Sequence, residues 1–404
     1  MMSKEKRRVP KLRFPGFTED WEQRKFKDIA FKRGKISEAD LPYVEFEDIN
    51  SGIGTLNKNI SQKVGHKKGL LFEAGDVLFG KLRPYLQNWL LCQFAGIAVG
   101  DFWVLQPQNV SSAFLYYLIQ SEAYQSVANI SSGTKMPRSS WPLVSETLFS
   151  IPKYKEANMI GEFFLLIDRT ITLHQRKLNN LKLKKKALLQ KLFPKNEERY
   201  PELRFPGFTD AWEQRKLNDF GIATGGTSIE SEFVDGGTYK VINIGSYSEE
   251  SVYNDQGLRV NKTDKTKSRI LNKYDLTMIL NDKTASGNII GRVLLIDQDN
   301  TYVYNQRTER IEVDTKDFLP MFLYHMLNAP EQRKYIVKAS QGNTQIYVNW
   351  STISNIDYMI PQLLLEQEKI ANLFSLINKD ITLHQRKLDH LQLQKKALLQ
   401  QMFV

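Results

Sequence analysis

Little in this sequence favours secretion or a membrane. Among its 404 residues is a single cysteine, Cys92, which cannot form an internal disulfide, so no oxidising compartment is required. The longest mainly apolar stretch, residues 89–105, is interrupted by Gln93 and Asp101 and falls short of the roughly 18 residues that a membrane span needs. The first residues are charged where a secretory signal would be apolar. We therefore expect a cytoplasmic protein without a membrane partner.

Signatures of catalysis are also missing. Residues 75–82 match the spacing of a phosphate-binding loop, but Leu82 stands where a Ser or Thr hydroxyl would hold Mg²⁺. No two prolines are adjacent, which removes the Asp/Asn-Pro-Pro-aromatic signature of amino-group methyltransferases, and no GxGxxG motif opens a helix. One cysteine and five histidines are scattered without metal-ligand spacing. We expect no catalytic residue, no metal site and no cofactor in this chain.

The charge is unevenly distributed. The net charge is +11, with +12 in residues 1–200 and −1 in residues 201–404. A basic excess suits a polyanion, most often nucleic acid, although solubility alone explains such an excess equally well.

An internal repeat organises the chain. LRFPGFTEDWEQRK at residues 12–25 returns as LRFPGFTDAWEQRK at residues 203–216, with 12 of 14 positions identical. ITLHQRKLNNLKLKKKALLQKLF at residues 171–193 returns as ITLHQRKLDHLQLQKKALLQQMF at residues 381–403, with 17 of 23 identical. The segments between them diverge. The chain is therefore two copies of one unit, each with a variable middle and a near-constant end.

The constant ends predict two long helices. Mostly apolar residues recur at alternating steps of three and four, which is the pattern of a coiled-coil seam. Each seam needs a partner, and the other copy is the nearest, in either a parallel or an antiparallel pair. We expect the two histidines to form a register-setting polar layer rather than a metal site. The seam positions are Phe164, Ile167, Ile171, His174, Leu178, Leu181, Lys185, Leu188 and Leu192, and then Phe374, Ile377, Ile381, His384, Leu388, Leu391, Lys395, Leu398 and Met402.

The variable middles predict mixed α/β domains. Short apolar or alternating runs separated by glycine-rich turns indicate strands, and residues 112–127 and 318–327 indicate helices. The fold class we expect is α+β, with two mixed domains separated by two long helices.

Basic and amide side chains gather in the glycine-rich turns. Arg, Lys, Asn and Gln are the side chains that pair with base edges, and Ser and Thr can also serve phosphates. Both copies place such residues at corresponding points, while the surrounding sequence differs. We therefore expect DNA contacts from Arg33, Lys35, Lys81, Arg83, Asn88, Ser132, Thr134, Lys135 and Arg138 in the first copy, and from Thr227, Lys283, Asn288, Arg292, Asn305, Gln306, Arg307, Asn343, Thr344, Gln345 and Tyr347 in the second.

Several motifs carry a family resemblance: the paired LRFPGF segments, the helices with ITLHQRKL and KKALLQ, the GGT loop at residues 225–227 and the NQR loop at residues 305–307. In these motifs the chain resembles the specificity subunits of type I restriction-modification systems. The resemblance covers essentially the whole chain, and it is closest to a branch found in Gram-positive bacteria such as staphylococci. It implies target recognition domains at residues 12–150 and 203–359, and helices at 151–195 and 360–404 that form an antiparallel coiled coil.

The resemblance further implies a role in host defence. Each recognition domain would read one half of a bipartite double-stranded DNA site, and the coiled coil would set the spacer. Two methyltransferase subunits would dock on this frame and methylate adenine N6, and two restriction subunits would translocate and cut DNA. S-adenosylmethionine, ATP and Mg²⁺ would belong to those partners. Two alternatives remain open at this point: a DNA-organising coiled-coil protein without sequence preference, and a self-contained DNA-modifying enzyme.

Overall fold

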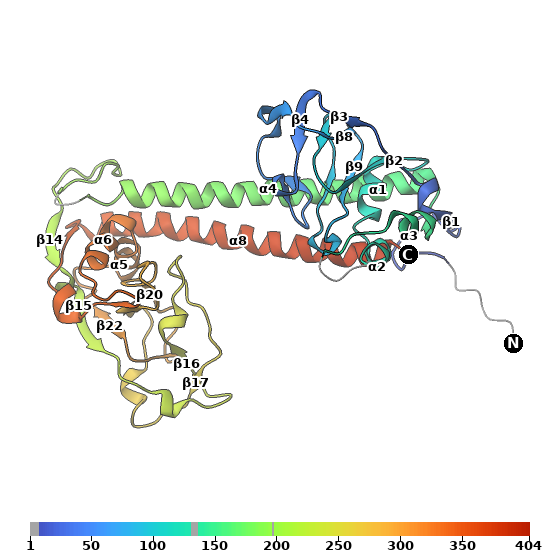
Figure 1. Ribbon diagram of the computed structural model, residues 1–404. Coiled ribbons are helices and arrows are strands. Elements are labelled where there is room, and N and C mark those ends of the chain that lie inside the picture. Colours follow the sequence, from blue (N-terminus) through green and yellow to red (C-terminus); the bar gives the residue numbers. More distant parts are fainter. Residues whose placement is uncertain (1–7, 131–135, 196–197) are drawn as a thin grey trace. The chain divides into compact units, whose positions relative to one another are not determined.

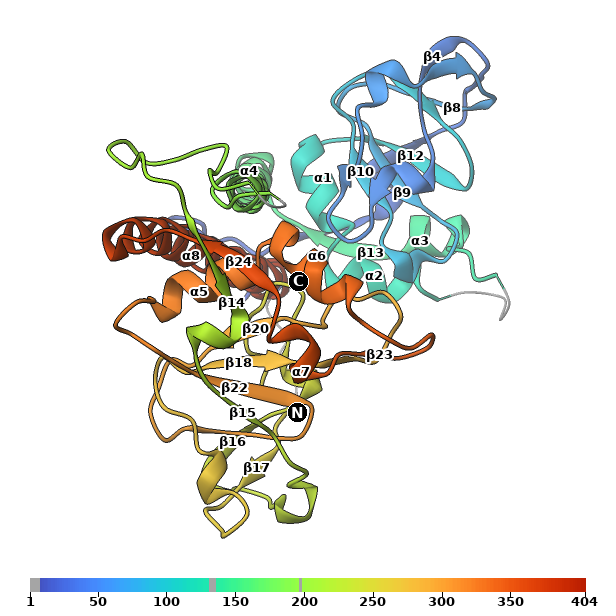
Figure 2. The same cartoon turned by 90° about the vertical axis from the view of Figure 1, so that its left-hand side faces the viewer.

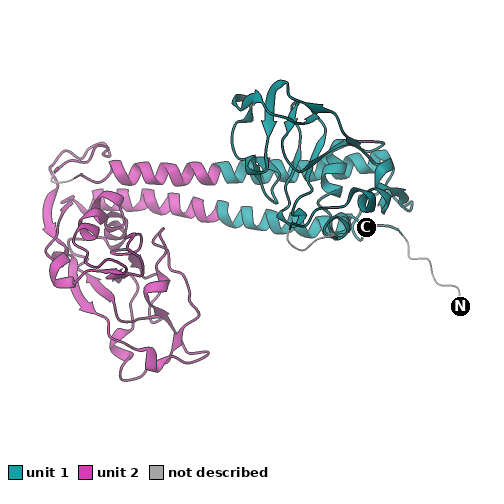
Figure 3. Cartoon of the chain, viewed as in Figure 1, with its two compact units in different colours: residues 1–176, 384–404 teal, residues 177–383 magenta. Residues whose placement is uncertain are grey.

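The computed structural model describes residues 8–130, 136–195 and 198–404 (Figure 1). The chain forms two compact units, and each combines a mixed α/β domain with parts of both long helices (Figure 3). Unit 1 contains residues 1–176 and 384–404, and unit 2 contains residues 177–383. The units therefore do not follow consecutive segments of the chain, and the four-segment division made from the sequence stays a prediction.

The long helices are α4 (Tyr154–Lys191) and α8 (Leu364–Met402). Every expected seam residue on them is buried or partly buried. By contrast, six leucines at other positions are 61–67% exposed, and they recur at the offset of the repeat: Leu166, Leu173 and Leu183 on α4, and Leu376, Leu383 and Leu393 on α8. The two helices thus bury one stripe and leave a second apolar set in solvent.

Within each unit the two helices run antiparallel. In unit 1, Phe164 near the start of α4 lies 6.1 Å from Phe403 just after α8, measured between ring centroids. Farther along α4, His174 meets His384. In unit 2, the rings of Phe193 and Phe374 stack at 6.0 Å. The direction that the seam pattern alone left open is therefore antiparallel.

The contact between His174 and His384 joins their Nδ1 atoms at 2.9 Å. Because an imidazole Nδ1 either donates or accepts, one ring must be the donor and the other the acceptor. The two residue numbers differ by the offset of the repeat, so the repeat maps this contact onto itself.

Unit 1 contains a four-stranded sheet of order β10-β9-β12-β2 and a five-stranded sheet of order β3-β8-β11-β4-β7. The pairs β1-β13 and β5-β6 complete its strands. Their bounds are β1 Glu22–Lys25, β2 Ala30–Arg33, β3 Ile36–Ser37, β4 Asp40–Val44, β5 Ile49–Asn50, β6 Thr55–Leu56, β7 Val64–His66, β8 Gly69–Phe72, β9 Val77–Gly80, β10 Trp89–Leu91, β11 Gly96–Ala98, β12 Phe102–Pro107 and β13 Leu148–Ile151; the short helices are α1 Ser112–Leu118, α2 Glu122–Ala128 and α3 Trp141–Glu146.

Unit 2 repeats this plan with a four-stranded sheet of order β15-β22-β18-β20, seen in Figure 2, and a three-stranded sheet of order β17-β16-β21. The pairs β14-β24 and β19-β23 are also present. Their bounds are β14 Glu213–Lys216, β15 Gly221–Gly225, β16 Tyr239–Ile242, β17 Arg259–Val260, β18 Leu276–Ile279, β19 Asn281–Asp282, β20 Val293–Leu295, β21 Tyr302–Tyr304, β22 Thr308–Val313, β23 Ile346–Tyr347 and β24 Asp357–Ile360; the short helices are α5 Pro320–Leu327, α6 Pro330–Lys338 and α7 Trp350–Ile353.

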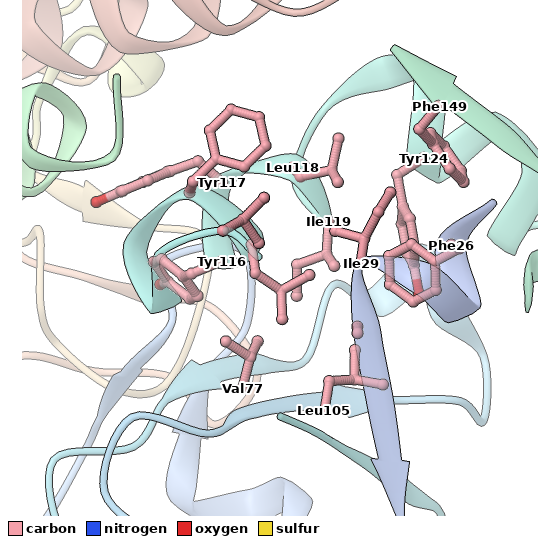
Figure 4. Packing of buried hydrophobic residues seen from close by; sticks show 14 of the residues in the cluster. Phe26, Ile29, Val77, Leu105, Tyr116, Tyr117, Leu118, Ile119, Tyr124 and Phe149 are labelled. Atoms are coloured by element: carbon pink, nitrogen blue, oxygen red, sulfur yellow. The ribbon is translucent and has the colours of Figure 1, made fainter. Parts of the chain in front are cut away.

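The four-stranded sheet of unit 1 is buried on both faces. Val77 and Leu105 pack toward α1 and α2, where Ile119 and Tyr124 join the same cluster (Figure 4). Leu78, which follows Val77, belongs to a separate cluster on the other face. Burial on both faces explains why β9, which contains Val77 and Leu78, is a continuous apolar run rather than an alternating one.

The repeated LRFPGF segments tie the helix ends together. Arg13 donates two hydrogen bonds to the buried carboxylate of Glu156 at 2.6 and 2.8 Å, and Arg204 makes the equivalent pair with Glu366, both at 2.8 Å. The backbone N–H of Leu12 donates to Gln401 at the end of α8. Each segment thus links the start of one long helix to the end of the other, since the N–H of Leu203 likewise donates to Lys191 of α4.

One expectation about the short helices is wrong. Residues 112–127 form two helices, α1 and α2, instead of one, because Ser121 interrupts the run and caps α2 by accepting a hydrogen bond from the N–H of Tyr124. The short helices α3, α6 and α7 were not expected.

Removing Arg204 should destabilise unit 2, because Glu366 would remain buried without its counter-ion. We expect Arg204→Met to lower the free energy of unfolding by about 3 kcal/mol in urea denaturation. The control is Arg215→Met, whose pair with Glu213 is exposed on both sides and should change stability by less than about 1 kcal/mol. Equal losses in the two variants would contradict the role given to the buried pair.

Candidate nucleic-acid interface

The four-stranded sheets of the two units share one register. Ala30 faces Pro107 across β2 and β12, and Gly221 faces Val313 across β15 and β22. Counting from these pairs, Gly34 occupies the place of Gly225. The RGK turn at residues 33–35 therefore corresponds to the GG turn at residues 225–226, with Gly34 in the place of the first glycine.

Three segments meet at the end of the central strand in each unit. In unit 1, the N–H of Lys81 donates to Asp101 at 2.8 Å, and the N–H of Ser139 donates to Lys81 at 2.9 Å. In unit 2, Leu280 donates to Arg307 at 2.8 Å, and Val348 donates to Leu280 at 2.9 Å. The same backbone frame therefore brings together loops whose side chains differ between the units.

In unit 1 this frame gathers cations. Arg138 and Lys81 both pair with Asp101, at 2.9 and 3.4 Å. Lys32 lies 4.8 Å from the ring centroid of Trp141. Burial and the neighbouring Lys81 lower the pKa of Lys32, while burial alone would raise the pKa of Asp101 and its pairing with Arg138 and Lys81 lowers it overall. Two cations paired with one carboxylate, and Lys32 near Lys81, leave this part of unit 1 positive.

Three other residues of unit 1 that were expected to contact DNA differ in whether a ligand can reach them. Arg83 is exposed, and its backbone adopts a left-handed φ of 48°. Lys35 is also exposed. Asn88, however, is buried and accepts a hydrogen bond from Ser51. The expected contacts Ser132, Thr134 and Lys135 lie outside the described residues.

Arg33 is held inside its own domain. Its Nε lies 2.8 Å from the buried carboxylate of Asp76, and its Nη2 lies 2.7 Å from Glu73. A side chain in two ion pairs must break them before it can reach a base or phosphate. The structure thus gives Arg33 a structural partner that its place in a glycine turn did not reveal.

In unit 2 the NQR loop fastens the GGT loop. Asn305 is 5% exposed, and its Oδ1 accepts hydrogen bonds from the N–H of Ile229 and of Gln306. The side-chain amides of Asn305 and Gln306 both donate to Glu230 at 2.9 Å. Hydrogen bonds from Ser228, Asn305 and Gln306 lower the pKa of Glu230 to about 2. Asn305 and Gln306 are therefore engaged within the protein.

Glycine is required at residue 226 because the backbone of the NQR loop approaches it closely. A Cβ at Gly226 would collide with the backbone oxygen of Asn305, and the N–H of Gly226 donates to Thr308 at 2.8 Å. This packing carries the exposed Thr227 to the same edge as the NQR loop.

The side chains available to a ligand in unit 2 form a separate group. Arg307 is exposed, with a left-handed φ of 64° that turns the chain between β21 and β22. Thr227 lies directly after the GG turn, and the remaining members follow Gly342 or lie beside its segment, since β23 pairs with β19. All are exposed and have no recorded side-chain partner in the part of the chain that the structure describes: Thr227, Lys283, Arg307, Asn343, Thr344, Gln345 and Tyr347.

Two expected residues of unit 2 point elsewhere. Asn288 donates to Glu249 at 2.9 Å. Arg292 donates to the backbone oxygen of Asn288 and to Ser251. Their contacts are with the loop that carries Glu249 and Ser251, rather than with the exposed group around Arg307.

Sequence reasoning missed Glu309 and Arg269. Arg269 donates to the backbone oxygen of Gly225 at 2.5 Å and to the hydroxyl of Tyr304 at 2.9 Å. Glu309 faces Gly225 across β15 and β22, and burial raises its pKa to about 7 although Arg269 opposes the shift. The signal that could have found Glu309 is the alternation of its strand, which places it on the same face as the buried Ile311.

Folding places lysines of the first sequence copy in unit 2. The second half of α4 belongs to unit 2, and it adds six lysines to a copy whose own sequence is close to neutral: Lys177, Lys182, Lys184, Lys185, Lys186 and Lys191. The basic character of the first half of the sequence is therefore shared by both units.

Two kinds of feature are absent from the residues that the structure describes. Within residues 8–130, 136–195 and 198–404, no three His, Cys, Asp or Glu side chains gather in a way that could hold a metal ion. Across the same ranges, no helix combines the length and the apolar character of a membrane span.

Comparison with known proteins places this fold in a class. The chain has the fold of a type I restriction-modification S subunit from M. genitalium, with 13% identity, a TM-score of 0.60, and 98% and 99% of the two chains covered. It also has the fold of a chain from a study of complex assembly and conformational transition in a type I restriction-modification system, with 16% identity, a TM-score of 0.54, and 94% and 96% coverage.

Sequence comparison shows the family. Residues 18–183 and 209–393 each match the type I restriction modification DNA specificity domain, and the chain belongs to this family. A curated relative is the MjaVIII type I restriction enzyme specificity subunit of Methanocaldococcus jannaschii, which is 24% identical over 96% of this chain and 92% of that protein. The family resemblance predicted from the repeated motifs is thereby confirmed, while the Gram-positive branch stays a prediction.

The raised pKa of Glu309 predicts a pH dependence of stability. A carboxyl whose pKa is raised on folding contributes stability that is complete below its unfolded value, near 4.3, and is lost as pH rises through about 7. We therefore expect the free energy of unfolding of unit 2 to fall between pH 4.5 and 7.5, and Glu309→Gln to flatten that slope. Urea denaturation across this pH range checks it, and an unchanged slope in the variant would contradict the assignment.

Proposed function

We propose that this chain is the non-catalytic specificity subunit of a type I restriction-modification complex, in which each α/β domain reads one half of a bipartite DNA site. The observation that carries this proposal is the frame shared by the two units. Identical backbone hydrogen bonds hold Lys81, Asp101 and Ser139 in one unit and Leu280, Arg307 and Val348 in the other. A constant frame with different exposed side chains suits two readers of different half-sites.

The available side chains suit DNA in two different ways. In unit 1, Lys32, Lys81 and Arg138 give a positive surface that suits phosphates and guanine edges. In unit 2, Asn343 and Gln345 suit adenine, and Arg307 suits guanine. The side chains of Arg33, Asn88, Asn305 and Gln306 already have partners within the protein, and we assign them to the shape of the reading surface instead; Asn288 and Arg292 lie outside that surface.

The long helices supply the spacer and the docking frame in this proposal. The six exposed leucines of α4 and α8 recur at the offset of the repeat, which suits a partner that binds in two copies. We assign them to two methyltransferase subunits, with two restriction subunits joining the complex. S-adenosylmethionine, ATP and Mg²⁺ then act in those partners, and the assembled complex methylates adenine N6 in the cytoplasm.

The complex should methylate a split motif. We expect co-expression with the methyltransferase subunit of the same system to modify adenines in two short half-sites separated by a fixed spacer, and replacement of residues 12–150 by those of a related chain to change one half only. Single-molecule sequencing of the host genome measures both. A contiguous motif would contradict the two-reader architecture, and turnover by this chain alone would contradict the non-catalytic role.

The exposed residues of unit 2 should decide its half-site. We expect Arg307→Ala and Gln345→Ala each to weaken binding of the cognate site by about 1–3 kcal/mol and to relax preference at one base position. Lys338→Ala, an exposed change on α6, is the control and should leave both unchanged. The measurement is competition binding of the assembled complex against DNA with single substitutions at physiological salt. Equal loss on every sequence would instead indicate phosphate contacts.

A further inference from the structure

The connection between β9 and β10 of unit 1 has unusual backbone geometry. Arg83 adopts a φ of 48° and Gln87 a φ of 58°, and residues other than glycine rarely adopt such left-handed values. Between them, Pro84–Leu86 form one turn of 3-10 helix. Strained backbone of this kind persists only where the surrounding structure holds it, and it clusters at functional sites. Residues 83–87, the RPYLQ turn, are therefore a candidate for a function beyond joining two strands.

The RPYLQ turn is anchored to two other parts of unit 1. The N–H of Arg83 donates to the backbone oxygen of Pro137 at 2.7 Å, and the N–H of Gly52 donates to the backbone oxygen of Gln87 at 2.9 Å. Pro84 is buried. Two further backbone hydrogen bonds, of 2.8 and 2.9 Å, close the turn internally. The turn is therefore held at both ends by segments that are distant from it along the chain.

This anchored turn exposes two large apolar side chains that are consecutive in the sequence. Tyr85 is 57% exposed and Leu86 is 44% exposed. Because transfer of apolar surface out of water is favourable, both side chains favour contact with a partner. An exposed apolar group that is bordered by polar residues is typical of an interaction site. The question is which kind of partner covers it.

Three cations lie at the same edge as the RPYLQ turn. Arg83 is the first residue of the turn and is exposed. Leu82 forms a β-bridge with Arg138, which places Arg138 beside the start of the turn. Lys81 precedes this bridge, and among the described residues Lys81 and Arg138 share a single carboxylate, that of Asp101. The edge is therefore positive, which favours a polyanion as the partner of the apolar pair.

DNA offers its largest apolar surfaces between stacked bases. A protein reaches them by inserting an apolar side chain into a base step, which unstacks and kinks the step, while cations hold the phosphates nearby. An aromatic ring stacks on any base, because every base has a π-face. The RPYLQ turn meets both requirements, since it carries an aromatic ring and a leucine beside three cations.

Unit 2 lacks a turn of this kind. The corresponding connection, residues 280–292 between β18 and β20, lies wholly within the described residues and exposes no large apolar side chain. An exposed aromatic residue at the edge of unit 2, Tyr347, lies on a strand, β23, which pairs with β19. The exposed apolar turn is therefore a feature of unit 1.

We propose that Tyr85 and Leu86 form a wedge that enters the base stack of the half-site read by unit 1, with the ring of Tyr85 stacked on an opened base step. The inference rests on the proposed function and goes beyond it, because the wedge reads the deformability of DNA rather than its base edges. Pyrimidine–purine steps unstack most easily, so the half-site of unit 1 contains or adjoins a TA or CA step. The RPYLQ turn places no such requirement on the half-site of unit 2.

The test uses the chain assembled with the methyltransferase subunit of its own system on cognate DNA. The probe is 2-aminopurine, an adenine analogue that fluoresces when unstacked, placed singly at adenines other than the methylated ones. We expect fluorescence to rise at one step of the unit 1 half-site with the wild type and with Tyr85→Phe, and to stay low with Tyr85→Ala.

The same variants are compared in DNA affinity. Tyr85→Ala should weaken binding by roughly 5- to 150-fold without changing its salt slope, because a ring and not a charge is lost. Leu86→Ala should act in the same direction, and Tyr85→Phe should bind as the wild type does. Tyr154→Ala, which removes a similarly exposed ring at the start of α4, is the control and should change neither affinity nor fluorescence.

Three results would overturn the inference. Wild-type fluorescence and affinity in Tyr85→Ala mean that the turn does not enter the base stack. Weaker binding in both Tyr85→Ala and Tyr85→Phe, with unchanged fluorescence, means that the tyrosine hydroxyl contacts a phosphate. Weaker assembly of Tyr85→Ala with the methyltransferase subunit, at unchanged DNA affinity of the assembled complex, means that a protein covers the turn. By contrast, a wild-type complex that binds cognate and unrelated DNA equally refutes the proposed function itself.

Discussion

The antiparallel pairing of α4 with α8 is the contact on which the rest of the structure depends. Neither helix can bury its apolar stripe alone, and each compact unit is completed by the end of the helix that begins in the other. Phe403 and Phe193, which follow the helix ends, enter the cores of unit 1 and unit 2 respectively. The ion pairs of Arg13 and Arg204 then fix the leader segments to the helix starts. This dependence explains why the leaders and helices are nearly identical in the two copies, while the domains between them diverge.

The two units use one frame for different surfaces. The end of the central strand is held by the same backbone hydrogen bonds in both, yet it presents lysine and arginine in unit 1 and mainly amides and hydroxyls in unit 2. The frame also hides part of what the loops contain. Arg33 is paired with Asp76, and the side chain of Asn305 is hydrogen-bonded to the backbone of Ile229 in the loop that it supports. A reading surface of this kind can change its exposed residues freely, because the residues that hold its shape are separate from those that face a ligand.

The near-identity of the helices conceals an electrostatic difference. Lys395 and Lys185 occupy equivalent seam positions, but among the described residues only Lys395 forms an ion pair, with Asp168, whose equivalent in the second copy is Asn378. Similarly, the lysines of the second half of α4 join a unit whose own sequence is close to neutral. The first difference lies in the sequence, whereas the second arises because each helix begins in one unit and ends in the other.

The sequence by itself determined the repeat, the two long helices, the seam residues and the mixed α/β character of the domains, since these follow from periodicity and from near-identical segments. It did not determine the direction of the helix pair, the break between α1 and α2 at Ser121, or which polar loop residues are exposed. Tertiary structure decided those, because Arg33, Asn305 and Arg307 look alike as polar residues at the ends of strands and differ only in the partners that folding brings to them. A carboxylate such as Asp76 or Glu230, distant along the chain or on another loop, removes one polar side chain from the surface and leaves the next one free.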